Sequence, residues 1–342
     1  MQDAYESGPR TALRHSDFPS LDVLGRVATV EALFLTHHDR GLPEPSAGDG
    51  RSLLILSAVF LVGCGAFAIF QAASGHFLPH DTVYLSMTAD ELCALQGCRI
   101  LHFMIHDRIS FGGVIVAIGV LYLWLALFPL RHGESWAWWA IALSGVTGFL
   151  SFLAYLGYGY LDTWHGVATL ALLPPFVAGL VRARRLRHCT SEPEPLDLRS
   201  GRGVGRVFLL LSSIGIAVAG LVITSVGMTR VFVPQDLEFI GLTRESIGAI
   251  NPHLIPLIAH DRAGFGGALA SFGVAMFACV RYARSSPSLW QALTVAGVVG
   301  FGTAVGVHPA IGYLSLTHLG PAVFGAFVFG TGLALAAQDS PA

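Results

Sequence analysis

The chain of 342 residues is 53% hydrophobic and only 12% charged, with a mean hydropathy of +0.63. Soluble domains carry about 25% charged residues, so this composition leaves too little polar surface for a water-soluble globule and indicates a membrane protein. The formal net charge of −2 provides no basic excess, which excludes nucleic acid as an expected partner.

The first 51 residues are polar enough to lie outside a bilayer, and the first apolar run begins near Ser52. A long charged stretch precedes that run, so we expect no cleavable signal peptide. The pattern predicts a cytoplasmic N-terminal segment over residues 1–51, followed by an uncleaved first span.

A helix that crosses a bilayer needs about 20 largely apolar residues. Windows without charged side chains predict about eight such spans, and therefore an all-α polytopic membrane helix bundle. The predicted spans are Leu53–Ala73, Ile109–Leu130, Trp136–Leu156, Gly166–Val181, Val207–Met228, Ala263–Val280, Leu289–Val307 and Leu316–Ala336.

The distribution of arginine predicts the orientation of these spans. If the N-terminus is placed inside, 15 of the 20 arginines lie in inside segments, as the positive-inside rule requires. Seven of them fall in an Arg-rich cytoplasmic linker over residues 182–206. We therefore expect an integral protein of a bacterial inner (plasma) membrane, with both termini cytoplasmic and the lipid bilayer as its main partner.

The sequence repeats itself at a spacing of 154 residues, because HDRISFGG from His106 recurs as HDRAGFGG from His260. Downstream, Tyr160 corresponds to Tyr313. The pattern predicts two tandem four-helix membrane repeats, residues 52–181 and 207–338. Repeats with an even number of spans have the same orientation, so the axis that relates them lies along the membrane normal.

Each repeat has a long outer loop between its first two spans, residues 74–101 and 229–257. In the first loop Thr88 and Glu91 have the spacing of a capping box, so we expect short helices that cover the bundle. The cysteines of this loop, Cys93 and Cys98, predict either a disulfide in an oxidising compartment or two free thiols.

Four histidines occupy matching places at the outer ends of spans, two in each repeat: His106, His165, His260 and His318. Polar residues within a membrane tend to face the bundle interior and to be functional. Imidazole is a common ligand of haem iron and of transition metal ions. We therefore predict a His-ligated haem or transition metal centre near the extracytoplasmic face. The pattern leaves open whether His106 pairs with His165 and His260 with His318, or whether all four share one site.

Six neighbouring residues are candidates for supporting that centre: His102, Asp107, Arg108, Asp162, Asp261 and Arg262. A carboxylate beside a metal-bound imidazole orients the ring. The Asp-Arg pairs have a second interpretation, in which they clamp the outer loops to the bundle through Asp81 and Asp236. His308 has no counterpart in the first repeat, so we rank it below the four repeated histidines.

These features favour a membrane redox or metal-dependent protein, and they do not decide whether it is an enzyme. The alternatives are a structural or assembly subunit that binds other membrane subunits, and a small-solute transporter. Aromatic residues at the predicted outer interface fit an aromatic belt, with a quinone or haem pocket as the other interpretation. These residues are Tyr155, Tyr158, Tyr160 and Trp164.

Overall fold

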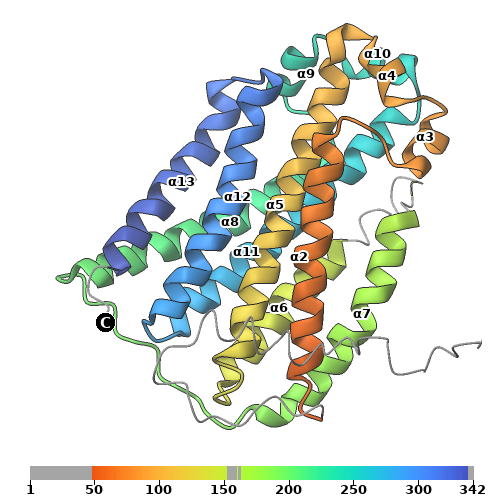
Figure 1. Ribbon diagram of the computed structural model, residues 1–342. Coiled ribbons are helices and arrows are strands. Elements are labelled where there is room, and N and C mark those ends of the chain that lie inside the picture. The colour runs from red at the N-terminus through yellow and green to blue at the C-terminus, as the bar shows by residue number, and fades with distance from the viewer. Residues whose placement is uncertain (1–47, 152–159, 161–162, 338–342) are drawn as a thin grey trace, which may run out of the picture. The chain divides into compact units, whose positions relative to one another are not determined.

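The computed structural model describes residues 48–151, 160 and 163–337, and this part of the chain is built from α-helices (Figure 1). Several sequence predictions fall outside the described residues: the segment before residue 48, the end of the third span, Tyr155 and Tyr158, and the candidate Asp162.

Eight long helices occur in the described residues, in the order in which the sequence predicts spans. They are α2 (Arg51–Ala73), α5 (Arg99–Leu127), α6 (Ser135–Ser151), α7 (Thr163–Ala183), α8 (Gly201–Met228), α11 (Leu254–Tyr282), α12 (Pro287–Ile311) and α13 (Leu316–Ala337). All except α6 are long and apolar enough to cross a membrane. The described residues of α6 cover the first part of the predicted third span. The chain is therefore an integral membrane protein with seven candidate spans in its described part.

The two central helices, α5 and α11, begin much earlier than predicted. The sequence starts the second span at Ile109 and the sixth at Ala263, whereas α5 begins at Arg99 and α11 at Leu254. The prediction is wrong because it excluded charged side chains from the spans. In the folded chain these side chains are paired inside the bundle, so each His-Asp-Arg run lies within its helix and not at its first turn.

Helices α5 and α11 form the centre of the bundle. In their apolar segments 67% and 78% of the residues are buried, whereas the other five candidate spans have 28% or less. The central helices contact each other, and each also packs closely on the first helix of its own half: α5 on α2, and α11 on α8. These close contacts use glycine, since Gly65 faces Gly112 and Gly220 faces Gly266, backbone against backbone.

The two halves of the chain do not pack as separate bundles. Helix α5 of the first half lies against α12 of the second, and α11 of the second half lies against α6 of the first (Figure 1). Side chains at one end of α5 and α11 therefore meet residues that are distant in the sequence.

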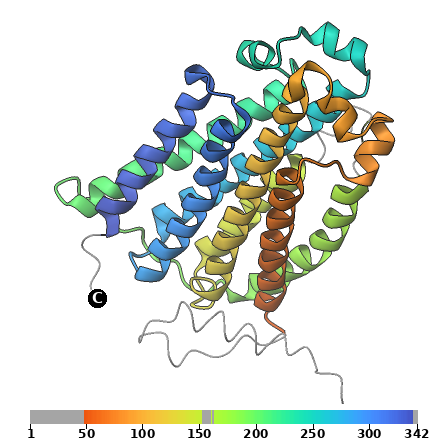
Figure 2. The same ribbon diagram turned by 45° about the horizontal axis from the view of Figure 1, so that its top comes forward.

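Short helices gather at one end of the bundle, as the sequence predicts for the two long loops (Figure 2). They are α3 (Pro79–Leu85), α4 (Ala89–Cys93), α9 (Pro234–Ile240) and α10 (Arg244–Ile250). The predicted capping box at the start of α4 is confirmed, because Thr88 Oγ1 accepts from Glu91 N and Glu91 accepts from Thr88 N. The hydrogen bonds that Thr88 N and Thr88 Oγ1 donate to the Glu91 carboxylate lower the pKa of this group. Of the two alternatives for Cys93 and Cys98, the structure has the disulfide.

The two loops are joined to each other as well as to the bundle. Asn251 Nδ2 donates to the carbonyl of Leu85 at 2.7 Å, and His253 Nδ1 lies 2.6 Å from the carbonyl oxygen of Tyr84. Beneath them buried side chains from both loops and from α5 and α11 form one apolar cluster, which includes Phe103 and Leu257. The loops thus form a fixed cover over this end of the bundle.

Candidate metal centre and buried ion pairs

Two arginines connect the central helices to the loops at the covered end. Arg108 of α5 contacts Asp81 at the start of α3 and Asp261 of α11, each at 2.7 Å. Arg262 of α11 pairs in the same way with Asp236 of α9, at 2.5 Å, and with Asp107 of α5, at 3.2 Å.

The ion pairs bear on the clamp interpretation of the Asp-Arg runs. Asp81 and Asp236 are 1% and 0% exposed, so each arginine neutralises a loop carboxylate that water cannot solvate. The predicted loop clamp is therefore confirmed. The sequence did not predict that each arginine also pairs with the aspartate of the other central helix.

Three histidines from three helices meet beside Arg262. They are His106 of α5, His308 of α12 and His318 of α13, and one ring nitrogen from each lies within 4.8 Å of the other two. The ring centroids of His106 and His308 are 4.6 Å apart, and His318 lies 5.4 Å from both. His106 and His308 are buried, at 4% and 3% exposed. Of the described residues, this is the one group of acidic, histidine and cysteine side chains that could hold a metal ion.

Carboxylates and a tyrosine surround the three histidines. His106 Nδ1 lies 3.0 Å from Asp107 Oδ1, and His318 Nδ1 lies 3.6 Å from Asp236 Oδ1. Tyr313 stacks on His318 at 4.4 Å and donates a hydrogen bond of 2.8 Å to Asp236. Burial and the neighbouring carboxylate raise the pKa of Tyr313, so its hydroxyl keeps this proton at neutral pH. A carboxylate at one edge of the imidazole is the usual support of a metal-bound histidine, and His106 and His318 each have one.

The geometry fits a small ion. An ion bonded to nitrogens at about 2.1 Å in a tetrahedral arrangement needs them about 3.4 Å apart, so each ring has to move inward by less than about 1 Å. The backbone of Ala304 is the hydrogen-bond partner within reach of the buried His308 ring, so at least one of its two ring nitrogens has no partner among the described residues. Buried polar atoms normally have partners, so His308 has the unsatisfied ring nitrogen that a metal ligand requires.

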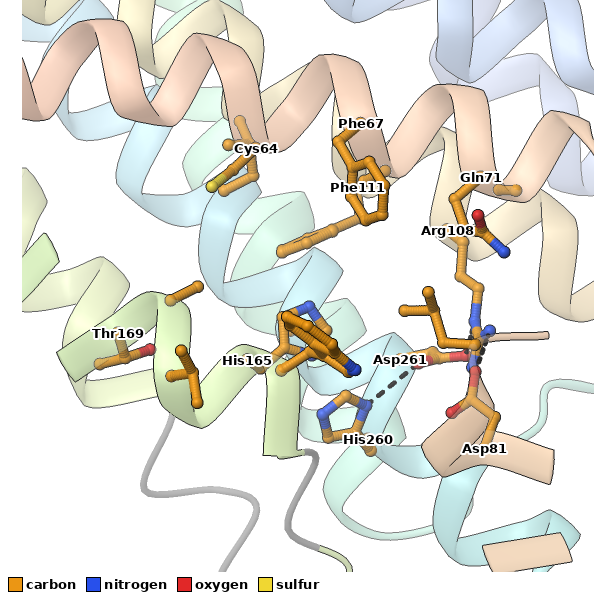
Figure 3. A pocket seen from close by; sticks show the side chains of 18 of the residues that line it. Cys64, Phe67, Gln71, Asp81, Arg108, Phe111, His165, Thr169, His260 and Asp261 are labelled. Carbon is orange, nitrogen blue, oxygen red and sulfur yellow. Dashed lines mark hydrogen bonds and ion pairs between the residues drawn. The ribbon is translucent and has the colours of Figure 1, made fainter. Parts of the chain in front are cut away.

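The other two repeated histidines form a second pair. His165 of α7 and His260 of α11 have ring centroids 5.1 Å apart. Tyr160 lies 5.0 Å from His260 and donates to Asp81 at 2.8 Å. His260 Nδ1 lies 3.0 Å from Asp261 Oδ1. Figure 3 shows His165 and His260 side by side, with Asp261, Arg108 and Asp81 beyond them.

The contacts differ from the pairing considered within each repeat. His106 meets His318 and His165 meets His260, so each pair joins the two halves. The physical reason is the packing of α5 on α12 and of α11 on α6, which carries each central histidine to the opposite half.

Sequence reasoning ranked one residue of this cluster too low. His308 lacks a repeated counterpart, yet the structure places it between His106 and His318. Its position ten residues before His318, near the end of an apolar span, was the available signal. His102, one turn before His106, is half-buried and does not belong to the three-histidine group.

Comparison with protein-family models, curated proteins and solved structures finds no match for this chain.

Proposed function

We propose that the chain is a membrane metal protein, with one transition metal ion bound by His106, His308 and His318. The observation that carries this proposal is the convergence of three imidazoles, two of them buried, within 4.8 Å. Three neutral nitrogen ligands suit zinc, copper, iron or nickel. Copper or iron at this place would give the redox protein that the sequence favours.

A single ion fits the three-histidine group better than haem does. Two imidazoles that bind haem iron lie on opposite faces of a flat porphyrin. Here a third ring, His308, lies 4.6 Å from His106 and 5.4 Å from His318, where the porphyrin would have to pass. The proposal therefore keeps the metal from the sequence prediction and assigns it a different set of ligands.

Metal content tests the proposal. Detergent-purified chain is expected to hold about one ion after dialysis, measured by elemental analysis, because three ligands are already gathered. Exchange of His308 for Phe should weaken binding by about 100-fold or more, since loss of a mere supporting partner already costs 10–100-fold. The control is His132→Phe, at an exposed histidine outside the cluster.

Metal that stays bound at the same affinity in the His308→Phe protein would refute the assignment. A folded wild-type chain without metal, after growth with added copper, iron and zinc, would refute the proposed function and favour an assembly subunit. An absorption spectrum of the same sample detects haem by its Soret band.

We further propose that the two halves are tandem repeats of one four-helix unit. Matching contacts support this: Arg108 and Arg262 each pair with a loop aspartate and with the aspartate of the other central helix. Tyr160 and Tyr313, which the sequence aligns, each donate to the loop aspartate of their own half.

We propose an orientation in which the covered end faces the extracytoplasmic side. The disulfide between Cys93 and Cys98 supports it, because such bonds persist in oxidising compartments. Cys189 is an exposed free thiol in the Arg-rich linker. A maleimide that cannot cross membranes should label Cys93 and Cys98 in intact cells only after reduction. It should label Cys189 only in inverted vesicles, and the opposite pattern would invert the topology.

A further inference from the structure

A large apolar cavity lies beside the second histidine pair. Its volume is about 570 Å³, within the range of about 300–1,000 Å³ for ligand pockets. The walls come from α2, α5, α6, α7 and α11, and most of the lining is hydrophobic. Figure 3 shows how Phe67 and Phe111 line one part of it, while His165 and His260 lie at another.

Helices α2 and α7 both line the cavity. These helices touch at one end, where Gly179 packs on Gly50 and Leu54. Farther along they line the cavity from opposite sides, with side chains such as Phe67 and Trp164, which are 54% and 58% exposed. Because both helices are candidate membrane spans, the exposed rim borders lipid. A ligand can therefore enter from the bilayer.

The polar end selects against an anionic headgroup. Arg108 is the cation that lines the cavity, and it is already paired with Asp81 and Asp261. One positive charge against two carboxylates would repel a fatty-acid carboxylate or a lipid phosphate. A neutral headgroup that exchanges hydrogen bonds with imidazole avoids this repulsion.

We propose that this cavity binds a lipophilic quinone, with its ring at His165 and His260 and its apolar tail leaving between α2 and α7. One quinone carbonyl oxygen has two lone pairs and can accept from both imidazoles, whose ring centroids lie 5.1 Å apart. The aromatic side chains Phe111 and Phe149 also line the cavity and offer rings for stacking. The proposal does not depend on the metal centre, which uses other histidines.

The test uses the full chain in detergent and a radiolabelled benzoquinone with a decyl tail as the probe. Saturable binding of about one probe per chain is expected. His165→Phe keeps a ring of similar size but removes its hydrogen bonds, so it should weaken binding about tenfold. Unlabelled decylbenzene, which lacks the oxygens, should compete at least tenfold less well than the unlabelled quinone, and so should palmitate.

A cavity-filling pair on α2 provides the matched control. Ala68 lines the cavity, whereas Ala66 on the same helix is exposed and does not. Ala68→Trp should abolish binding, and Ala66→Trp should leave it unchanged. Equal binding by these two variants, equal competition by decylbenzene, or undiminished binding in His165→Phe would each overturn the proposal. A Soret band that is lost in His165→Phe would do so too, because it would assign the cavity to haem.

Discussion

Replacement of Arg262 by methionine is expected to destabilise the folded chain by about 3–5 kcal/mol, the usual cost of breaking a buried ion pair. The side chain of Arg262 is only 6% exposed, and it lies between Asp107 and Asp236, which are 2% and 0% exposed. Methionine fills part of the same space but leaves two carboxylates without a cation. The measurement is the midpoint of thermal unfolding in detergent, followed by circular dichroism.

A matched control and a rescue separate the stranded charges from loss of packing. Arg99→Met removes an exposed arginine from the first turn of α5 and should change stability by about 0.5 kcal/mol or less. Adding Asp107→Asn and Asp236→Asn to Arg262→Met should recover much of the loss, because the charges that lacked a partner are gone. If Arg262→Met and Arg99→Met unfold at the same temperature, the buried ion pairs do not stabilise the fold.

The same ion pairs connect the fold to the candidate metal centre. Asp107, held by Arg262, lies 3.0 Å from His106, and Asp236 lies 3.6 Å from His318. An arginine that fixes two carboxylates also fixes the imidazoles beside them. The network therefore orients two of the three proposed ligands while it attaches α9 to α11.

Most of the fold could be predicted from local patterns. Apolar segments located the long helices, Thr88 and Glu91 predicted the start of α4, and Cys93 and Cys98 were close enough to bond. These signals depend on neighbours in the sequence. The helix starts at Arg99 and Leu254 were missed because charged residues are excluded from a predicted span when the side chains that neutralise them are not known.

The candidate site could be predicted only in part, for a physical reason. Repetition singled out His106 and His318, since matching positions share an environment. Which histidines meet depends on how α5 packs against α12, and no pattern within one helix encodes that contact. His308 reaches the cluster through this packing, and its place near the end of an apolar span does not by itself indicate which histidines it meets.

The second large effect on stability is expected at the contact between α8 and α11. It is tested by substituting two glycines of α8, one at the contact and one away from it. A Cβ on Gly220 would lie 2.3 Å from Ala270 N and 2.5 Å from Gly266 O, whereas one on Gly215 would meet nothing within 4 Å. Backbone atoms cannot rotate away, so Gly220→Ala should force the helices apart and cost about 1–3 kcal/mol.

Gly215→Ala, in contrast, should stabilise the chain by about 0.4–1 kcal/mol, because alanine loses less backbone entropy on folding. The difference between the two unfolding midpoints is the decisive quantity, since both variants add the same methyl group to α8. Helix α2 in the first half offers a second, independent pair of alanine substitutions. A Cβ on Gly65 would lie 2.6 Å from Gly112 O, whereas a Cβ on Gly63 would meet nothing within 4 Å. Equal unfolding midpoints within both pairs would mean that α8 and α2 do not pack on the central helices through glycine. The positions of α5 and α11, which carry His106 and His260, would then have to be held by other contacts.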